Sequence, residues 1–182
     1  MNFIDRIDLA REFHESVAHA AGKYHGRPYR KVDHSKAADV SDVELGTDPD
    51  KGFDCSGLVI RSICDALGRR PRDTWRPEYR SAQGIREAVF DGSMDDYSRI
   101  RFSEVLPGDV ILWTDGGEKA EHCAIATHIL GSPSAGVSVP YTHATYRGDE
   151  GVRSDLLFYA SANSYLIPLG NLVQRAIKLD DD

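Results

Sequence analysis

Residues 53–59 read Phe-Asp-Cys-Ser-Gly-Leu-Val, and this stretch decides how the chain is expected to fold. Apolar residues at helical spacing begin with its last residue, Val59, and continue with Ile63 and Leu67. Gly68 comes directly after this pattern, and glycine commonly follows the last residue of a helix. We therefore expect a helix that begins near Cys55 and ends at Gly68.

Cys55 is a candidate nucleophile because of its place at the start of that helix. A thiol in the first turn faces unpaired backbone N–H groups and the positive end of the helix dipole, which favour the thiolate. The alternative role is a small residue packed at the helix start, with Asp54 or Ser56 as the N-cap. Of the other two cysteines, Cys64 lies in the apolar stripe of the helix and Cys123 in a β-rich run, and both are expected in the core.

The first half of the chain predicts two further helices and two loops. Apolar residues at three- and four-residue steps from Ile4 to Tyr24 predict one helix, and residues 81–90 predict another. Residues 27–53 are expected to form a long loop that includes the acidic stretch 39–50, whose role stays open. Residues 68–77 are expected to form a basic loop.

The second half of the chain has the composition of strands. Pro107–Gly108 predicts a turn. Four β-rich runs follow it: Asp109–Trp113, His122–Leu130, Val137–Tyr146 and Val152–Tyr159. Helices followed by strands predict an α+β fold, with N-terminal helices packed on an antiparallel β-sheet, in a single domain over residues 1–182.

Composition excludes several classes of protein. Hydrophobic residues make up 41% of the 182 residues and charged residues 28%, which rules out wholesale disorder. The net charge of −7 disfavours nucleic acid as a general partner. No apolar run reaches the roughly 18 residues that would predict a membrane span.

The N-terminus is charged from Asp5 onward and lacks the apolar core of a secretory signal, so the localisation stays open.

A cysteine nucleophile needs a base within hydrogen-bonding reach, and three histidines in the β-rich half are candidates. His122 and His128 are six residues apart on one face of an expected strand, so alternation does not separate them. His143 lies in the next expected strand, from which it could meet His122 across an antiparallel pair. From the residues alone, a structural role for each of these histidines remains an equal alternative.

Several motifs together resemble the NlpC-type cell-wall cysteine peptidases, a papain-like family of peptidoglycan endopeptidases. Their sequences are FDCSGLV at 53–59, LPGDVILW at 106–113, EHCAIA at 121–126 and THA at 142–144, preceded by GRPY at 26–29. The resemblance covers about residues 10–160 and implies a papain-like NlpC-type fold. The chain departs from the family pattern at Arg30-Lys31, in the acidic insertion, at Cys-Ala-Ile after His122 and in the long segment before His143.

The resemblance also implies roles for individual residues. It makes Cys55 the nucleophile, His122 the general base and His143 the group that orients His122. The residues that it places in substrate binding are Asp54, Ser56, Tyr29 and Arg72. A carboxylate at Asp54 could pair with the free amino terminus of a stem peptide. For Arg72, an exposed position in a basic loop is an equal alternative.

By resemblance, the substrate is peptidoglycan or a released muropeptide, and the bond joins γ-D-glutamate to diaminopimelate or lysine. No metal and no organic cofactor is implied.

Three alternatives stay open: a related amidase or acyltransferase with the same Cys and His, an inactive structural module of a phage tail or secretion assembly, and a metal-binding module. The ligands of that metal site would be Cys55, His122, His128 and His143. The missing signal leaves open non-classical export, a phage route or action inside the cell.

Overall fold

The structure is a computed structural model of the chain. It describes residues 3–34, 46–90, 105–116, 119–127, 138–146, 151–157 and 164–178. His128, residues 39–45 of the acidic stretch and the ends of three expected strands lie outside the described residues.

The described strands form one antiparallel sheet of five strands in the order β4-β3-β2-β1-β5. Their bounds are β1 Val110–Thr114, β2 Ala120–Ala126, β3 Val139–Thr145, β4 Gly151–Leu157 and β5 Ser164–Ile167. The first four confirm the strands expected from the sequence, and neighbours along the chain pair directly. The fifth was not expected, and it pairs with β1 at the edge of the sheet.

Helices account for most of the remaining described residues. Their bounds are α1 Phe3–Lys23, α2 Cys55–Ala66, α3 Pro71–Thr74, η1 Pro77–Tyr79, α4 Ala82–Val89 and α5 Leu169–Ala176. The expected helices at 4–24, 55–68 and 81–90 are confirmed as α1, α2 and α4. The expected basic loop at 68–77 is wrong in part: it contains α3 and the start of η1, because Pro71 and Pro77 each stand in a first helical turn, where proline is tolerated. The helix α5 was not expected.

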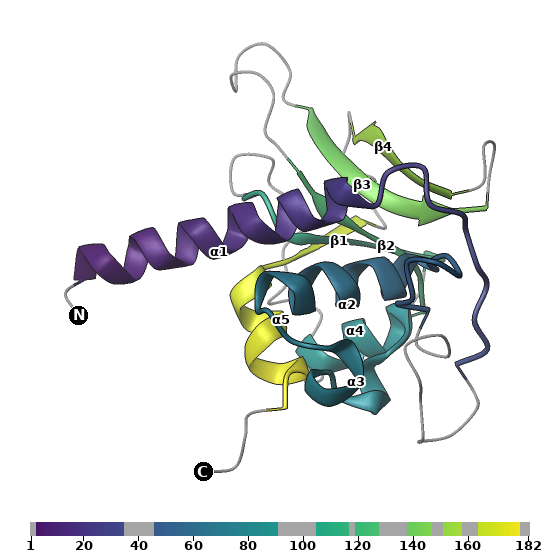
Figure 1. The fold of residues 1–182 in the computed structure, drawn as a ribbon, viewed down its shortest axis with the longest axis horizontal. Coiled ribbons are helices and arrows are strands. Elements are labelled where there is room, and N and C mark those ends of the chain that lie inside the picture. Colours follow the sequence, from purple (N-terminus) through teal and green to yellow (C-terminus); the bar gives the residue numbers. More distant parts are fainter. Residues whose placement is uncertain are drawn as a thin grey trace.

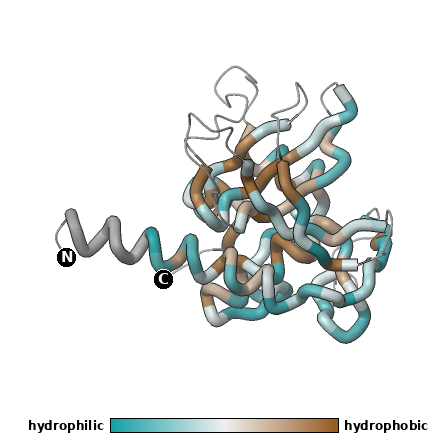
Figure 2. The backbone as a smooth tube through the Cα atoms, turned by 90° about the horizontal axis from the view of Figure 1, so that it is seen from above, coloured by the Kyte–Doolittle hydropathy of each residue, from teal (hydrophilic) through white to brown (hydrophobic). Residues whose placement is uncertain are grey.

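The sheet and the helices form an α+β fold with the helices α2 to α5 gathered beside one face of the sheet (Figure 1). Side chains alternate between the two faces of each strand, so Val110 and Leu112 join the large core with the helices, whereas Ile111 lies in a smaller cluster on the other face. In Figure 2 the strongly hydrophobic segments lie mostly inside the molecule and the hydrophilic segments mostly at its periphery.

The turn before β1 links three distant parts of the chain. Asp109 is buried, and its carboxylate accepts hydrogen bonds from the backbone N–H of Leu106 at 2.9 Å and of Leu169, the first residue of α5, at 3.0 Å. Gly108 has φ +90°, and a Cβ there would lie 2.6 Å from the carbonyl oxygen of His14 in α1. The expected turn at 107–108 is therefore confirmed, and it fixes the position at which β1 enters the sheet.

The described parts of the expected long loop, residues 27–34 and 46–53, contain no helix and only one isolated bridge, between Tyr29 and Phe53. This bridge holds the residue two positions before Cys55 against the chain that follows α1. Within the described residues, no helix combines the length and the apolar character that crossing a membrane requires.

Candidate active site

Cys55 is the first residue of α2, as the sequence predicts. Asp54 precedes it as the N-cap, and one of its carboxylate oxygens accepts a hydrogen bond from the backbone N–H of Gly57 at 2.6 Å. This cap fixes the first turn of the helix and therefore the direction of the Cys55 side chain. The thiol is half-buried and not part of a disulfide.

The Cys55 thiol is in hydrogen-bonding contact with the side chains of Cys123 and His122. The contact with Cys123 is the strongest influence that lowers the pKa of Cys55, burial opposes it, and the hydrogen bond and charge of His122 lower the pKa further. The net result is a pKa well below the ordinary value of a thiol. Burial and the neighbouring Cys55 raise the pKa of Cys123, so Cys55 is the thiol that ionises.

His122 and His143 meet across β2 and β3. The Nε2 atom of His122 lies 2.7 Å from Nδ1 of His143, and their rings cross at 75°. The ring of Trp113 lies beside that of His122, with 5.4 Å between ring centroids, because Trp113 faces His122 directly in the register of β1 and β2. Cys55, His122 and His143, which the sequence selected from three cysteines and seven histidines, are thus brought together.

Burial and the neighbouring His122 lower the pKa of His143 to about 4. The imidazole of His143 is therefore neutral at neutral pH. A neutral ring has one N–H donor and one bare nitrogen acceptor, so it can accept a hydrogen bond from His122 without adding a second positive charge to the site.

Asp155 and Arg153 of β4 extend the contact between His122 and His143. The sequence analysis selected neither residue. Nε2 of His143 lies 3.0 Å from Oδ2 of Asp155, and Nε and Nη2 of Arg153 each lie 3.0 Å from the same oxygen. Asp155 faces Tyr141 in the strand register, so it reaches His143 diagonally. Arg153 and Asp155 are two residues apart and therefore on one face of the expected strand, which was the signal in the sequence, but this spacing does not reveal the register of β4 on β3.

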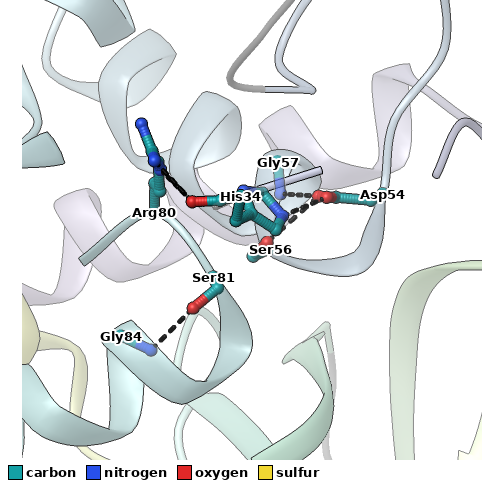
Figure 3. A network of polar contacts seen from close by, with 7 residues as sticks. All are labelled: His34, Asp54, Ser56, Gly57, Arg80, Ser81 and Gly84. Carbon is teal, nitrogen blue, oxygen red and sulfur yellow. Dashed lines mark hydrogen bonds and ion pairs between the residues drawn. The ribbon is translucent and has the colours of Figure 1, made fainter. Parts of the chain in front are cut away.

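Asp54 is already engaged by other residues of the chain (Figure 3). Its Oδ1 also accepts a hydrogen bond from the Ser56 hydroxyl at 3.0 Å, and its Oδ2 accepts one from Nε2 of His34 at 2.6 Å. Arg80 in turn donates two hydrogen bonds to the His34 backbone carbonyl. Burial raises the pKa of Asp54, and the hydrogen bond from His34 opposes that effect. Asp54 is therefore confirmed as the N-cap, the role that the sequence offered to Asp54 or Ser56, and both of its carboxylate oxygens are already hydrogen-bonded within the chain.

Two cavities meet at Cys55. One, of about 400 Å³, is lined by the histidine pair together with Trp113, Tyr141, Arg153 and Asp155. The other, of about 490 Å³, is lined by polar residues that include Lys31, His34, Ser56, Gln83 and Lys119. Tyr29, Cys55 and Glu121 line both. Cys55 therefore lies in a cleft with room for substrate on either side of the thiol.

The structure places Tyr29 at this junction, where burial and then the charge of Cys55 raise its pKa to about 12. It does not place Arg72 there. Arg72 lies on α3, with its side chain half-exposed and 3.5 Å from the carboxylate of Asp73, and it lines neither cavity. Arg72 therefore fits the alternative of an exposed position better than the role in substrate binding.

Among the described residues, no three His, Cys, Asp or Glu side chains are arranged to hold a metal ion, and His128, one of the ligands considered, is not among them. The site instead joins a thiol of low pKa, a histidine and a neutral histidine acceptor. Such an arrangement supplies a nucleophile and a base that can carry its proton.

No family model, curated protein or solved structure matches the chain.

Proposed function

We propose that this protein is a cysteine-dependent amide hydrolase with Cys55 as its nucleophile. The observation that carries the proposal is the contact of the Cys55 thiol with His122, whose other ring nitrogen lies 2.7 Å from His143, at the junction of two cavities. A buried thiol with a purely structural role would need neither a pKa below the ordinary value nor an opening to the surface.

In the proposed reaction, the Cys55 thiolate attacks the amide carbonyl carbon. The backbone N–H of Cys55 at the start of α2, with a neighbouring donor, stabilises the negative charge on the carbonyl oxygen. His122, which carries the thiol proton, gives it to the leaving amine as the C–N bond breaks. A water molecule then attacks the thioester and loses its proton to His122, and the acid product leaves as the Cys55 thiolate re-forms.

The proposed substrate class is the stem peptide of bacterial cell wall, with cleavage between γ-D-glutamate and diaminopimelate or lysine. It follows from the resemblance of the sequence to the NlpC-type peptidases. Two lysines on the lining of the larger cavity support it, because Lys31 and Lys119 can pair with the carboxylates that such peptides carry. The related amidase and acyltransferase reactions use the same Cys55 and His122 and differ only in the acyl acceptor.

The test follows L-Ala-γ-D-Glu-diaminopimelate by mass spectrometry, in its free and N-acetylated forms, with wild type and Cys55→Ala. Cys64→Ala is the matched control, because Cys64 is a buried thiol of the same helix. Cleavage by wild type and Cys64→Ala but not by Cys55→Ala is expected. Since Asp54 is already bonded to His34, we expect cleavage of both forms. Cleavage retained in Cys55→Ala, or absent from wild type, would contradict the proposal, and a wild type inert toward amides and esters would favour the inactive module.

A further inference from the structure

A carboxylate lies at the far end of the row of side chains that begins with Cys55. Asp155 is in β4, two strands away from His122, and reaches the row only through His143. Its carboxylate accepts from Nε and Nη2 of Arg153 and from His143, all on the same oxygen, with each atom pair 3.0 Å apart. The carboxylate is therefore held in place from two directions.

We propose that Asp155 is a positioning residue that fixes the protonation pattern of both histidines, so that His122 presents a bare Nδ1 to the Cys55 thiol. The catalytic role of Asp155 rests on the proposed function. The protonation pattern of His122 and His143 does not depend on it.

The first step of the argument concerns His143. An ionised carboxylate only accepts hydrogen bonds, so the nitrogen that faces it, Nε2 of His143, must carry a proton. His143 is neutral at neutral pH because burial and the neighbouring His122 lower its pKa to about 4. A neutral imidazole has a single N–H, and that N–H is used on Asp155. Nδ1 of His143 is therefore bare and can only accept.

The second step concerns His122. Its Nε2 lies 2.7 Å from the bare Nδ1 of His143, so Nε2 must donate the hydrogen bond. In neutral His122 the only proton is then on Nε2, and Nδ1 remains as the acceptor for the Cys55 proton. Once that proton has moved, both nitrogens of His122 donate, one to His143 and one to the thiolate. The same arrangement of acceptors thus suits both protonation states of His122.

Replacement of Asp155 by asparagine tests this reasoning, because an amide can donate where a carboxylate cannot. An amide N–H that faces Nε2 of His143 would move the proton of His143 to Nδ1. Two donors would then face each other between the rings, and neutral His122 would have to carry its proton on Nδ1, toward Cys55. In that state His122 cannot accept the thiol proton.

The experiment is ¹⁵N-resolved NMR of the histidine rings in the full chain at pH 7.5, which distinguishes protonated from bare ring nitrogens. For wild type, we expect the proton of His143 on Nε2 and that of His122 either on Nε2 or on both nitrogens. For Asp155→Asn, we expect His143 to be protonated on Nδ1. Asp155→Glu, which keeps the carboxylate, should keep the wild-type pattern. Asp50→Asn removes an exposed carboxylate elsewhere and is the matched control.

The rate of iodoacetamide reaction at Cys55 and the kcat for the wall peptide give the functional readouts. Residues that orient the histidine ligands of metal sites typically contribute about 10- to 100-fold to activity, and we expect a positioning carboxylate on a catalytic histidine to act on the same scale. In Asp155→Asn, kcat should fall by that factor with little change in KM, and the alkylation rate should fall as well. A wild-type His143 protonated on Nδ1, or an Asp155→Asn variant with unchanged ring signals and alkylation rate, would overturn the proposal. If the ring signals are as expected but wild type cleaves no wall peptide, the proposed function fails and the protonation pattern stands.

Discussion

Cys123, directly after His122 in β2, is the neighbour whose hydrogen-bonding contact most lowers the pKa of Cys55. Strand alternation places Cys123 and His122 on opposite faces, yet the thiol at the start of α2 contacts both. Burial and the neighbouring Cys55 raise the pKa of Cys123, so Cys55 is the thiol of the pair that ionises first. Cys123 therefore contributes to the reactivity of Cys55 besides filling the core.

Cys123→Val should raise the pKa of Cys55, because valine cannot donate a hydrogen bond to the thiolate. The measurement is the rate of alkylation of Cys55 against pH, with the modified peptide identified by mass spectrometry. We expect the midpoint to move to higher pH. Cys64→Val makes the same change at a buried thiol of α2 and should leave the midpoint in place. An unchanged midpoint in Cys123→Val would show that His122 and the backbone N–H of Cys123, which also lower the pKa of Cys55, activate the thiol without the Cys123 side chain.

His143 should make the stability of the protein depend on pH. Its pKa is about 4 in the folded chain against an ordinary 6.5, so below pH 6.5 the unfolded chain binds a proton that the folded chain does not. The free energy of unfolding should thus fall by about 3 kcal/mol between pH 6.5 and pH 4, the equivalent of the pKa difference. Urea unfolding of wild type and His143→Gln measures this, and the variant should lack that part of the slope. The exposed His19→Gln is the control, and an equal slope in His143→Gln would refute the expectation.

Asp54 should stabilise the folded protein because it is the N-cap of α2. Asp54→Ala removes the acceptor of the Gly57 N–H and should lower the free energy of unfolding by about 1–2 kcal/mol, the usual cost of a lost N-cap. Asp54→Asn keeps a side-chain oxygen that caps well, so it should cost less. Urea unfolding of both variants is the measurement. Equal losses in the two variants would show that the charge toward His34, rather than the cap, is what matters.

Gly57 is expected to tolerate no side chain. A Cβ at this position would lie 2.0 Å from the backbone carbonyl oxygen of Gly46, and backbone atoms cannot turn aside as a flexible side chain can. Gly57→Ala should therefore destabilise the protein by about 1–3 kcal/mol, as overpacked sites do, although alanine is the better helix former. Gly170→Ala in the first turn of α5, where the added Cβ meets no atom within 4 Å, is the control and should be neutral or stabilising. Thermal unfolding compares the two, and equal melting temperatures would contradict this explanation.

The helices and strands that could be predicted from the sequence are those whose apolar residues or β-rich composition form a clear local pattern. The apolar spacing in α1, α2 and α4, and the β-rich runs between turn residues that became β1 to β4, are local features, so they can be recognised without knowing which elements they pack against. β5 and α5 were missed because Pro168 and Gly170 interrupt a short segment. Leu169, Leu172 and Ala176, which are all buried, repeat at helical spacing and were the available signal.

In the site, Cys55, His122 and His143 could be selected because nucleophile and base chemistry restricts the residue types and the motifs mark their places. The position of Asp155 depends on the register between β3 and β4, which two short strands do not reveal in their sequences. His34 reaches Asp54 through the fold of a loop without regular structure, so no periodicity could have placed it there. Arg72 was selected from its neighbours in the sequence, and α3 holds it away from the cleft.

The contacts of His34 and Gly46 bear on how the protein can be engineered. His34 bonds to Asp54, a Cβ added at Gly46 would lie 3.2 Å from the Asp54 carboxylate, and a Cβ added at Gly57 would lie 2.0 Å from the Gly46 carbonyl oxygen. Both ends of the segment 35–45 are thus anchored at the start of α2. A substitution at His34 or at Gly46 should therefore disturb the first turn of α2 and with it the nucleophile, so neither position should be used for labelling or immobilising the protein.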